Sequence, residues 1–322
     1  MAAELDKLAQ LYVERGNSPR AALYKALASE ERAIGGPETV IPVASPIVEQ
    51  PTKEVKAPFG EMPVNVYVIK PVEGLALPSA DQLVTTSRTE LKSHFGIDVE
   101  VPTPPAELFQ TLEAFAERGI RNFDEVFYLP GIRLDKGHKF FKGRDKVKPE
   151  DYFWDQIKNG NYPAQNADLE AGWYIGDKRG KPQYDNGQQM YEDDYLAPLM
   201  EVLRSAGKVK RYENVPADSR FRVSPREIED VILPTFKEMS GAEGVVRNRR
   251  YMEFNVRGNM AHFEWGKTNT WEWFNDPAYP GAGRLLGGRS GGGGLAHVDS
   301  DRVFYRGDDL AFSPVVAFPS KA

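Results

Sequence analysis

The last fifth of the chain, residues 271–318, most restricts what the sequence can fold into. It opens on a Trp-Glu-Trp tripeptide at 271–273, and it passes through a glycine-rich run over 287–294. It closes on an apolar stretch over 310–318. Rigid apolar ends around a polar, glycine-rich middle predict a frame that holds a chemically varied surface.

The same region lacks five residue types. Residues 274–320 contain no Lys, Glu, Gln, Met or Trp. These are the amino acids that have no codon ending in a pyrimidine, so a segment diversified from pyrimidine-ending codons, such as those for Asn, would lack them. The competing explanation is a glycine-rich loop with an ordinary compositional bias. Diversification of this region is therefore one of two open interpretations.

The bulk composition excludes several classes of protein. With 322 residues, of which 41% are apolar and 27% charged, the chain has an ordinary globular balance and room for one large domain or two smaller ones. Its net charge of −6 lacks the basic excess of nucleic-acid-binding proteins, so we expect no nucleic-acid partner. Because it has no cysteine, disulfides, thiol nucleophiles and Cys-ligated metals are excluded.

The termini and hydropathy bear on location. The N-terminus is acidic and amphipathic, and it lacks the basic head and apolar run of a signal peptide. The sequence has no apolar run of about 20 residues, so we expect no membrane span. The expected location is the cytoplasm, or a virion or other particle assembled there.

The first 119 residues divide into three predicted parts. Residues 1–36 show helical spacing of apolar side chains, and residues 37–63 hold six prolines, which predict an extended linker. Residues 64–119 predict a small α/β unit. Its expected elements are a strand over 64–69, a helix over 79–95, a strand over 97–101 and a helix over 104–118. We expect residues 1–119 to serve oligomerisation or docking to a particle.

The remaining residues, 120–322, predict an α+β domain. Aromatic residues are frequent over 120–200, where we expect core-filling side chains in irregular segments and a buried strand over 171–175. Two helices are expected next, over 194–206 and 224–240. Short elements, the first over 250–256, follow the helices, and this order is typical of α+β proteins.

Candidate ligand-binding side chains lie in the polar middle of the last fifth. Arginine and aromatic side chains there are of the kind that dominates interfaces. The four histidines lack metal-ligand spacing, and no nucleophile elbow is present, so we assign no catalytic residue and no metal ligand. The candidate binding residues are Arg289, Ser290, His297, Asp299, Asp301, Arg302, Phe304, Tyr305, Arg306, Asp308 and Asp309.

Five further residues are expected to hold the frame. One tryptophan of the tripeptide is expected to fill the core and the other to support the neighbouring loops, while its glutamate bonds a backbone turn. A structural calcium ion is the only cofactor that the acidic pairs leave open. The frame residues are Asn269, Trp271, Glu272, Trp273 and Phe312.

These motifs carry a resemblance to a known family. Residues 268–273, Thr-Asn-Thr-Trp-Glu-Trp, resemble the Gly-Asn-x-Trp-Glu-Trp signature of the formylglycine-generating enzyme (sulfatase-modifying factor) branch of the C-type lectin-like fold. Residues 284–290 are similar to its Arg-x-x-x-Gly-Gly-Ser segment, and 310–313 stand where it has Ile/Leu-Gly-Phe-Arg. The match covers about residues 120–322. It implies a C-type lectin-like domain with two helices and short antiparallel strands, preceded by a smaller N-terminal region.

Departures from the family pattern weigh against enzymatic activity. Thr268, Ala311 and Ser313 replace a glycine, a glycine and an arginine of the family motifs, and the copper-binding cysteines are absent. The same branch includes the variable proteins of diversity-generating retroelements. This resemblance implies a non-catalytic receptor for a protein or carbohydrate ligand, with a hypervariable region over 289–309.

Two alternative functions stay open. The first is an enzyme of the same branch that uses a metal at His297, Asp299 and Asp301. The second is a phage attachment protein that uses the same fold for recognition.

Overall fold

The computed structural model describes residues 10, 25, 29, 77–137, 147–179, 181, 184 and 190–320. Of the predictions for residues 1–76, the linker over 37–63 and the strand over 64–69 lie outside the described residues. The chain divides into two compact units, Met1–Gly60 and Glu61–Ala322. The fold below is that of the second unit.

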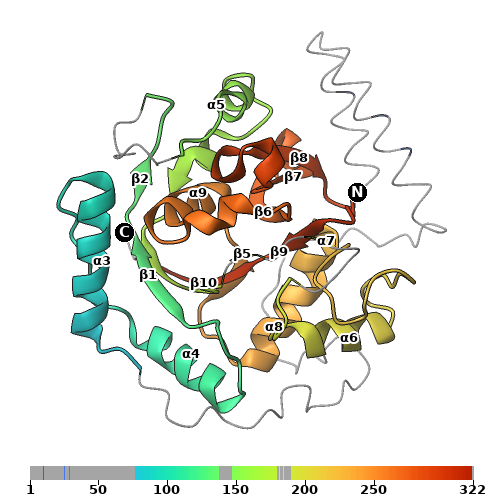
Figure 1. Ribbon diagram of the computed structural model, residues 1–322, viewed down its shortest axis with the longest axis horizontal. Coiled ribbons are helices and arrows are strands. Elements are labelled where there is room, and N and C mark those ends of the chain that lie inside the picture. Colours follow the sequence, from blue (N-terminus) through green and yellow to red (C-terminus); the bar gives the residue numbers. More distant parts are fainter. Residues whose placement is uncertain are drawn as a thin grey trace, which may run out of the picture. The chain divides into compact units, whose positions relative to one another are not determined.

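Among the described residues of this unit, two helices come first, as the sequence predicts (Figure 1). α3 (Ala80–Phe95) begins at Ser79, whose hydroxyl accepts the amide of Gln82 in a capping box. α4 (Ala106–Glu117) buries its apolar side chains on one face.

Two expectations for this region are wrong. Residues 97–101 form no strand, because the chain turns at Gly96 in the left-handed region and leaves Ile97 exposed. No division appears at residue 119 either, since Arg257 of the C-terminal part bonds Glu90 of α3 at 2.5 Å. The small α/β unit over 64–119 is therefore not separate from the C-terminal part where the structure describes it.

The first sheet has four antiparallel strands in the order β1-β4-β10-β5. Its strands are β1 (Glu125–Leu129), β4 (Gly172–Gly176), β10 (Pro314–Pro319) and β5 (Val245–Asn248). Every residue of β4 is buried, which confirms the buried strand expected over 171–175. The last strand of the chain, β10, therefore lies in the middle of this sheet.

The second sheet has the order β8-β7-β6-β9, with β9 parallel to β6 and the other pairs antiparallel. Its strands are β6 (Trp271–Ala278), β7 (Gly283–Gly287), β8 (Val298–Arg302) and β9 (Leu310–Phe312). The apolar stretch over 310–318 is not one strand, because it is interrupted at Ser313 and continues as β10 in the first sheet. A smaller sheet pairs β2 (Ile132–Arg133) with β3 (Asp168–Leu169).

Both helices expected in the C-terminal part are present. The first is α6 (Ala197–Ser205). The second begins at Ser224, which forms a capping box with Glu227, and it includes one π-helical turn. Its parts are α7 (Pro225–Glu227), the π turn η2 (Ile228–Ile232) and α8 (Leu233–Ser240). Helices and mainly antiparallel sheets together confirm the α+β class.

Two further helices were not expected. α5 (Asp151–Lys158) lies in the region predicted to be irregular, and α9 (Tyr251–Met260) replaces the short element over 250–256. Residues 251–259 are all buried, so α9 has no polar face and no amphipathic period in its sequence. Figure 1 shows α9 near the centre of this unit. Within the described ranges, every helix is too short or too polar to cross a lipid bilayer.

Five short 3₁₀ turns connect these elements. They are η1 (Ala164–Ala167), η3 (Phe263–Lys267), η4 (Tyr279–Gly281), η5 (Ser290–Gly292) and η6 (Gly294–Ala296).

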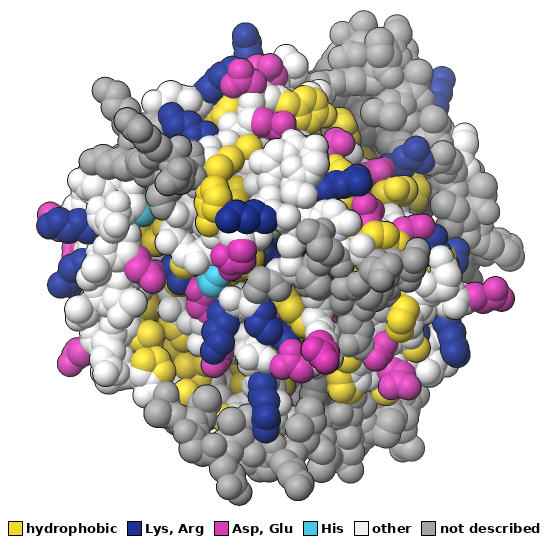
Figure 2. All heavy atoms as spheres, in the orientation of Figure 1, with side chains coloured by type: hydrophobic (Ala, Val, Ile, Leu, Met, Phe, Trp, Pro, Cys, Tyr) yellow, Lys and Arg dark blue, Asp and Glu magenta, His cyan; other side chains and the backbone are white. Residues whose placement is uncertain are grey.

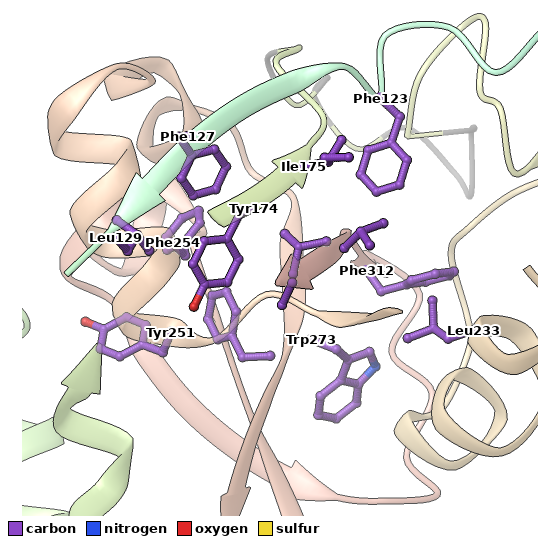
Figure 3. Close-up of a cluster of buried hydrophobic side chains, with 14 of the residues drawn as sticks. Phe123, Phe127, Leu129, Tyr174, Ile175, Leu233, Tyr251, Phe254, Trp273 and Phe312 are labelled. Carbon is purple, nitrogen blue, oxygen red and sulfur yellow. The ribbon is translucent and has the colours of Figure 1, made fainter. Parts of the chain in front are cut away.

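One large apolar core joins both sheets to the helices (Figure 3). The rings of Phe127 and Tyr174, from neighbouring strands of the first sheet, stack with centroids 5.4 Å apart. Trp273 of the second sheet is fully buried, and its indole donates to the carbonyl of Val223 at 3.0 Å. Phe312 is also fully buried. The expectation that one tryptophan fills the core is confirmed for Trp273.

Glu272 does not bond a turn as expected. It is fully buried, and its carboxylate receives two bonds from the guanidinium of Arg249, at 2.8 and 2.5 Å. The ammonium of Lys181 lies 3.5 Å away. Burial alone would raise the pKa of Glu272, but the charges of Arg249 and Lys181 outweigh it and hold that pKa below its ordinary 4.5. The residue therefore stays ionised inside the fold.

Glu272→Gln should lower the free energy of unfolding by about 3–5 kcal/mol at pH 7, because it leaves two buried cations without their carboxylate. The depressed pKa means that this stability is present above pH 4.5 and is lost as the pH falls through the folded-state pKa. Urea denaturation at several pH values should therefore show the difference from wild type narrowing below pH 4.5.

The control is Asp98→Asn, which breaks the exposed pair with Lys92. It should cost less than about 1 kcal/mol. Equal losses in the two variants would contradict the assignment.

Candidate ligand-binding surface

Residues 289–309 follow β7 and pass over one end, one edge and one face of the second sheet. From Arg289, two 3₁₀ turns lead into β8, the outer strand beside β7. Arg302 pairs with Gly283 at one end of the sheet, whereas Leu310 pairs with Trp271 at the other. The connection over 303–309 therefore crosses the sheet from one end to the other.

The structure buries none of the candidate binding residues. Three side chains of the segment are buried instead: Leu295, Val298 and Val303. The half-buried candidates are His297, Asp301, Phe304, Arg306 and Asp309. The exposed ones are Arg289, Ser290, Asp299, Arg302, Tyr305 and Asp308. The segment is thus anchored at a few apolar positions and presents the rest at the surface.

One group of candidates gathers around Trp271. The ring centroids of Trp271 and His297 lie 4.6 Å apart, edge to face. The Arg289 guanidinium lies 5.8 Å from the Trp271 ring and 3.8 Å from the Asp309 carboxylate. Burial lowers the pKa of His297, with the charges of Glu150 and Asp299 opposing it, so the imidazole is mainly neutral at pH 7. Trp271 therefore contacts two candidate side chains of the segment, His297 and Arg289.

A second group lies on the connection over 303–309. Tyr305 is 46% exposed, and its ring forms a T-shaped pair with that of Trp273, with centroids 6.5 Å apart. Arg306 bonds Glu227 at 2.8 Å, and Asp308 forms an ion pair with Arg222. These ion pairs attach the connection to residues outside the segment.

A third group forms a row on β8 and on the residue that precedes it. Residues two apart on a strand share a face, so His297, Asp299 and Asp301 lie on the same side. Burial raises the pKa of Asp301, and the charge of Asp299 raises it further. Within the described residues, no group of three or more His, Asp or Glu side chains is placed to hold a metal ion. This row therefore gives no support to the metal-dependent alternative.

Side chains from outside the segment hold its main chain. Tyr251 donates to the carbonyl of Ala296 at 2.6 Å, and Asn255 donates to that of Leu295 at 2.8 Å. The carboxylate of Glu150 accepts the amide of Val298 at 2.8 Å. Because these bonds end on backbone atoms, they do not depend on which side chains the segment carries.

Main-chain bonds hold the segment as well. The amide of Ser290 donates to the carbonyl of Thr268 at 2.7 Å, and that of Arg226 to the carbonyl of Val303 at 3.0 Å. Of the expected frame residues, Asn269 accepts the amide of Tyr184 just before this sheet.

Sequence analysis did not identify Glu150, Tyr251 and Asn255 as residues that bond the main chain of the segment. They come from the start of α5 and from α9, the two helices that were not expected. Each lies between 40 and 148 positions from its partner, so local spacing gives no signal.

Comparison with known proteins gives no family. No protein-family model matches the chain, and no curated protein or solved structure matches it.

Substitutions in the glycine run test which of its positions require glycine for the observed backbone conformation. Gly294 has φ +62°, and a Cβ there would overlap the carbonyl oxygen of Gly266, whereas a Cβ at Gly291 meets nothing. Gly294→Ala should lower the free energy of unfolding by about 1–3 kcal/mol. Gly291→Ala should change it by less than about 1 kcal/mol. Thermal melting of the two variants checks this, and equal melting temperatures would show that the turn is not fixed.

Proposed function

We propose that the protein is a non-catalytic recognition protein that presents residues 289–309 as a variable ligand-binding surface. The proposed scaffold is C-type lectin-like, as in the variable proteins of diversity-generating retroelements. The observation that carries the proposal is that the segment is held through its main chain, while the candidate binding side chains reach the surface. Such a segment tolerates many side chains without loss of the fold.

The compositional bias supports the same function. Residues 274–320 lack the five residue types that a pyrimidine-ending codon cannot specify. Most of the exposed residues in 274–320 belong to residues 289–309, the segment whose main chain is bonded by residues outside it. Bias and geometry are independent of each other, so their coincidence favours diversification over chance.

The scaffold assignment rests on the sequence motifs and on a consistent arrangement of elements. The motif tripeptide begins β6, and its Trp273 fills the core under the crossing connection. Two helices, α6 and the one over 225–240, precede the sheet in the order that the resemblance implies.

The ligand is proposed to be a protein or a carbohydrate. Trp271, Arg289 and Tyr305 supply partly exposed anchors of the kind that dominates interfaces. Figure 2 shows Lys and Arg side chains interspersed with Asp and Glu over one face of the molecule. A surface of mixed sign favours recognition by local contacts rather than by a long-range field of one sign.

Sequencing the locus and its neighbourhood across a population of the source organism tests diversification. We expect substitutions at the exposed positions between 289 and 309, with Gly294, Leu295, Val298 and Val303 unchanged. A near-identical template copy should lie nearby, beside a reverse transcriptase gene. A segment as constant as α9, with no template copy, would refute the proposal.

A display library tests whether the frame tolerates diversity. Randomising the six exposed candidates together should leave most clones resistant to protease, because surface substitutions usually change stability by less than about 0.5 kcal/mol each. The matched control randomises Leu295, Val298 and Val303, where most clones should be degraded. Equal survival in the two libraries would contradict the proposed division between frame and surface.

A further inference from the structure

The loop between α6 and α7 forms a pocket outside residues 289–309. The pocket has a volume of about 880 Å³ and is lined by residues 211–217. Asn214, on its wall, accepts a bond from the guanidinium of Arg222 at 2.8 Å, and Arg222 is also paired with Asp308. These bonds connect the pocket to the connection over 303–309. Its volume is in the range of sites that bind small molecules.

Cationic side chains gather around Tyr212 on the wall of the pocket. The Lys210 ammonium lies 5.2 Å from the centre of the Tyr212 ring, and the Arg222 guanidinium lies 4.7 Å from it. Burial raises the pKa of Tyr212, while the charges of Arg306 and Arg204 act in the opposite direction. Four cations therefore lie near this one ring.

The charges of these four cations are only partly balanced. Arg222 and Arg306 each have a carboxylate partner. Within the described residues, Lys210 and Arg204 have no carboxylate at ion-pair distance. The pocket is therefore locally positive, although the whole chain has a net charge of −6.

Arg204 lies behind the wall of this pocket. It is only 2% exposed, and its guanidinium donates to the carbonyls of Pro216 and Ala217, at 2.6 and 3.2 Å. Its Nε atom has no hydrogen-bond partner in the described part of the chain. Burial lowers the pKa of Arg204 to about 10, with the charges of Glu227 and Asp218 opposing it, so the group stays charged at pH 7. A buried charge without a partner is unfavourable, so an anion in the pocket would be attracted to it.

The wall of the pocket favours a saccharide over an acidic peptide as the carrier of that anion. Glu213 is exposed on the wall, where its carboxylate would repel a ligand with many negative charges but could accept bonds from sugar hydroxyls. The Asn214 oxygen bonds Arg222, which leaves its amide nitrogen to donate to a hydroxyl. The half-buried Tyr212 adds a hydroxyl of its own.

We propose that the pocket lined by residues 211–217 binds the sulfate or carboxylate group of an acidic saccharide. Lys210, Arg211 and Tyr212 contact the ligand, and the buried Arg204 adds positive potential behind the wall. The pocket does not depend on the proposed function, because these residues lie outside 289–309. Only the idea that the rest of the same ligand reaches residues 289–309 rests on that function. Constant residues would then hold the charged group, while variable residues read the remainder.

Isothermal titration calorimetry of the full-length protein compares lactose with lactose that carries one sulfate group. We expect the sulfated form to bind at least about 10-fold more tightly, which corresponds to about 1.4 kcal/mol, and its affinity to fall as salt is added. Lys210→Gln/Arg211→Gln should weaken binding of the sulfated form by at least about 10-fold. The matched control, Lys158→Gln/Lys237→Gln, removes the same charge at exposed positions of α5 and α8 and should bind as wild type.

Two further measurements test the ligand class and the buried charge. Hexaglutamate, an acidic peptide, should bind more weakly than sulfated lactose. Arg204→Lys keeps the buried charge and should retain binding, whereas Arg204→Met should weaken it. Circular dichroism checks that each variant is folded, and if Arg204→Met does not fold, the Lys210 and Arg211 pair decides.

Three results would overturn the proposal: lactose and its sulfate bind equally or not at all, the loop pair and its control bind alike, or hexaglutamate binds more tightly. None of these results bears on diversification. Conversely, a segment 289–309 that is constant across a population would refute the proposed function and leave this site untouched.

Discussion

The buried pair between Glu272 and Arg249 links the two large sheets. Glu272 belongs to β6 in the second sheet, and Arg249 directly follows β5 in the first. The amide of Arg249 also bonds the carbonyl of Ser313, where the chain passes from one sheet to the other. A buried charge without its partner is strongly unfavourable, so only arrangements that bring these residues together are compatible with a folded core. The link therefore ties β6, which carries Trp271 and Trp273, to the first sheet.

The residues that hold the backbone of the segment are distinct from the side chains that form its surface. The buried helix α9 holds the backbone of residues 289–309 through Tyr251 and Asn255, and Glu150 at the start of α5 adds a further bond. The side chains of the same segment that bind it to the rest of the fold are the apolar anchors Leu295, Val298 and Val303. To these are added the ion pairs of Arg306 with Glu227 and of Asp308 with Arg222. Specific shape is therefore supplied by one part of the sequence and surface chemistry by another.

Features with local signals were predictable from the sequence. The helices expected over 79–95 and 224–240 are both present, and each begins at a serine that forms a capping box. The exposure of six of the eleven candidate side chains also agrees with the polar character of the segment. Features that depend on tertiary contacts were not predictable. α9 is buried on all sides and has no amphipathic period, and nothing in the spacing of Glu272 identifies Arg249 as its partner.

The position of β10 determines what a frameshift or stop codon earlier in the gene does to the fold. This strand is encoded after residues 289–309, yet it lies between β4 and β5, and without it both would expose unpaired edges. A frameshift or stop codon introduced in the segment removes β10 as well. Only a message whose reading frame is intact through β10 can therefore yield the complete first sheet.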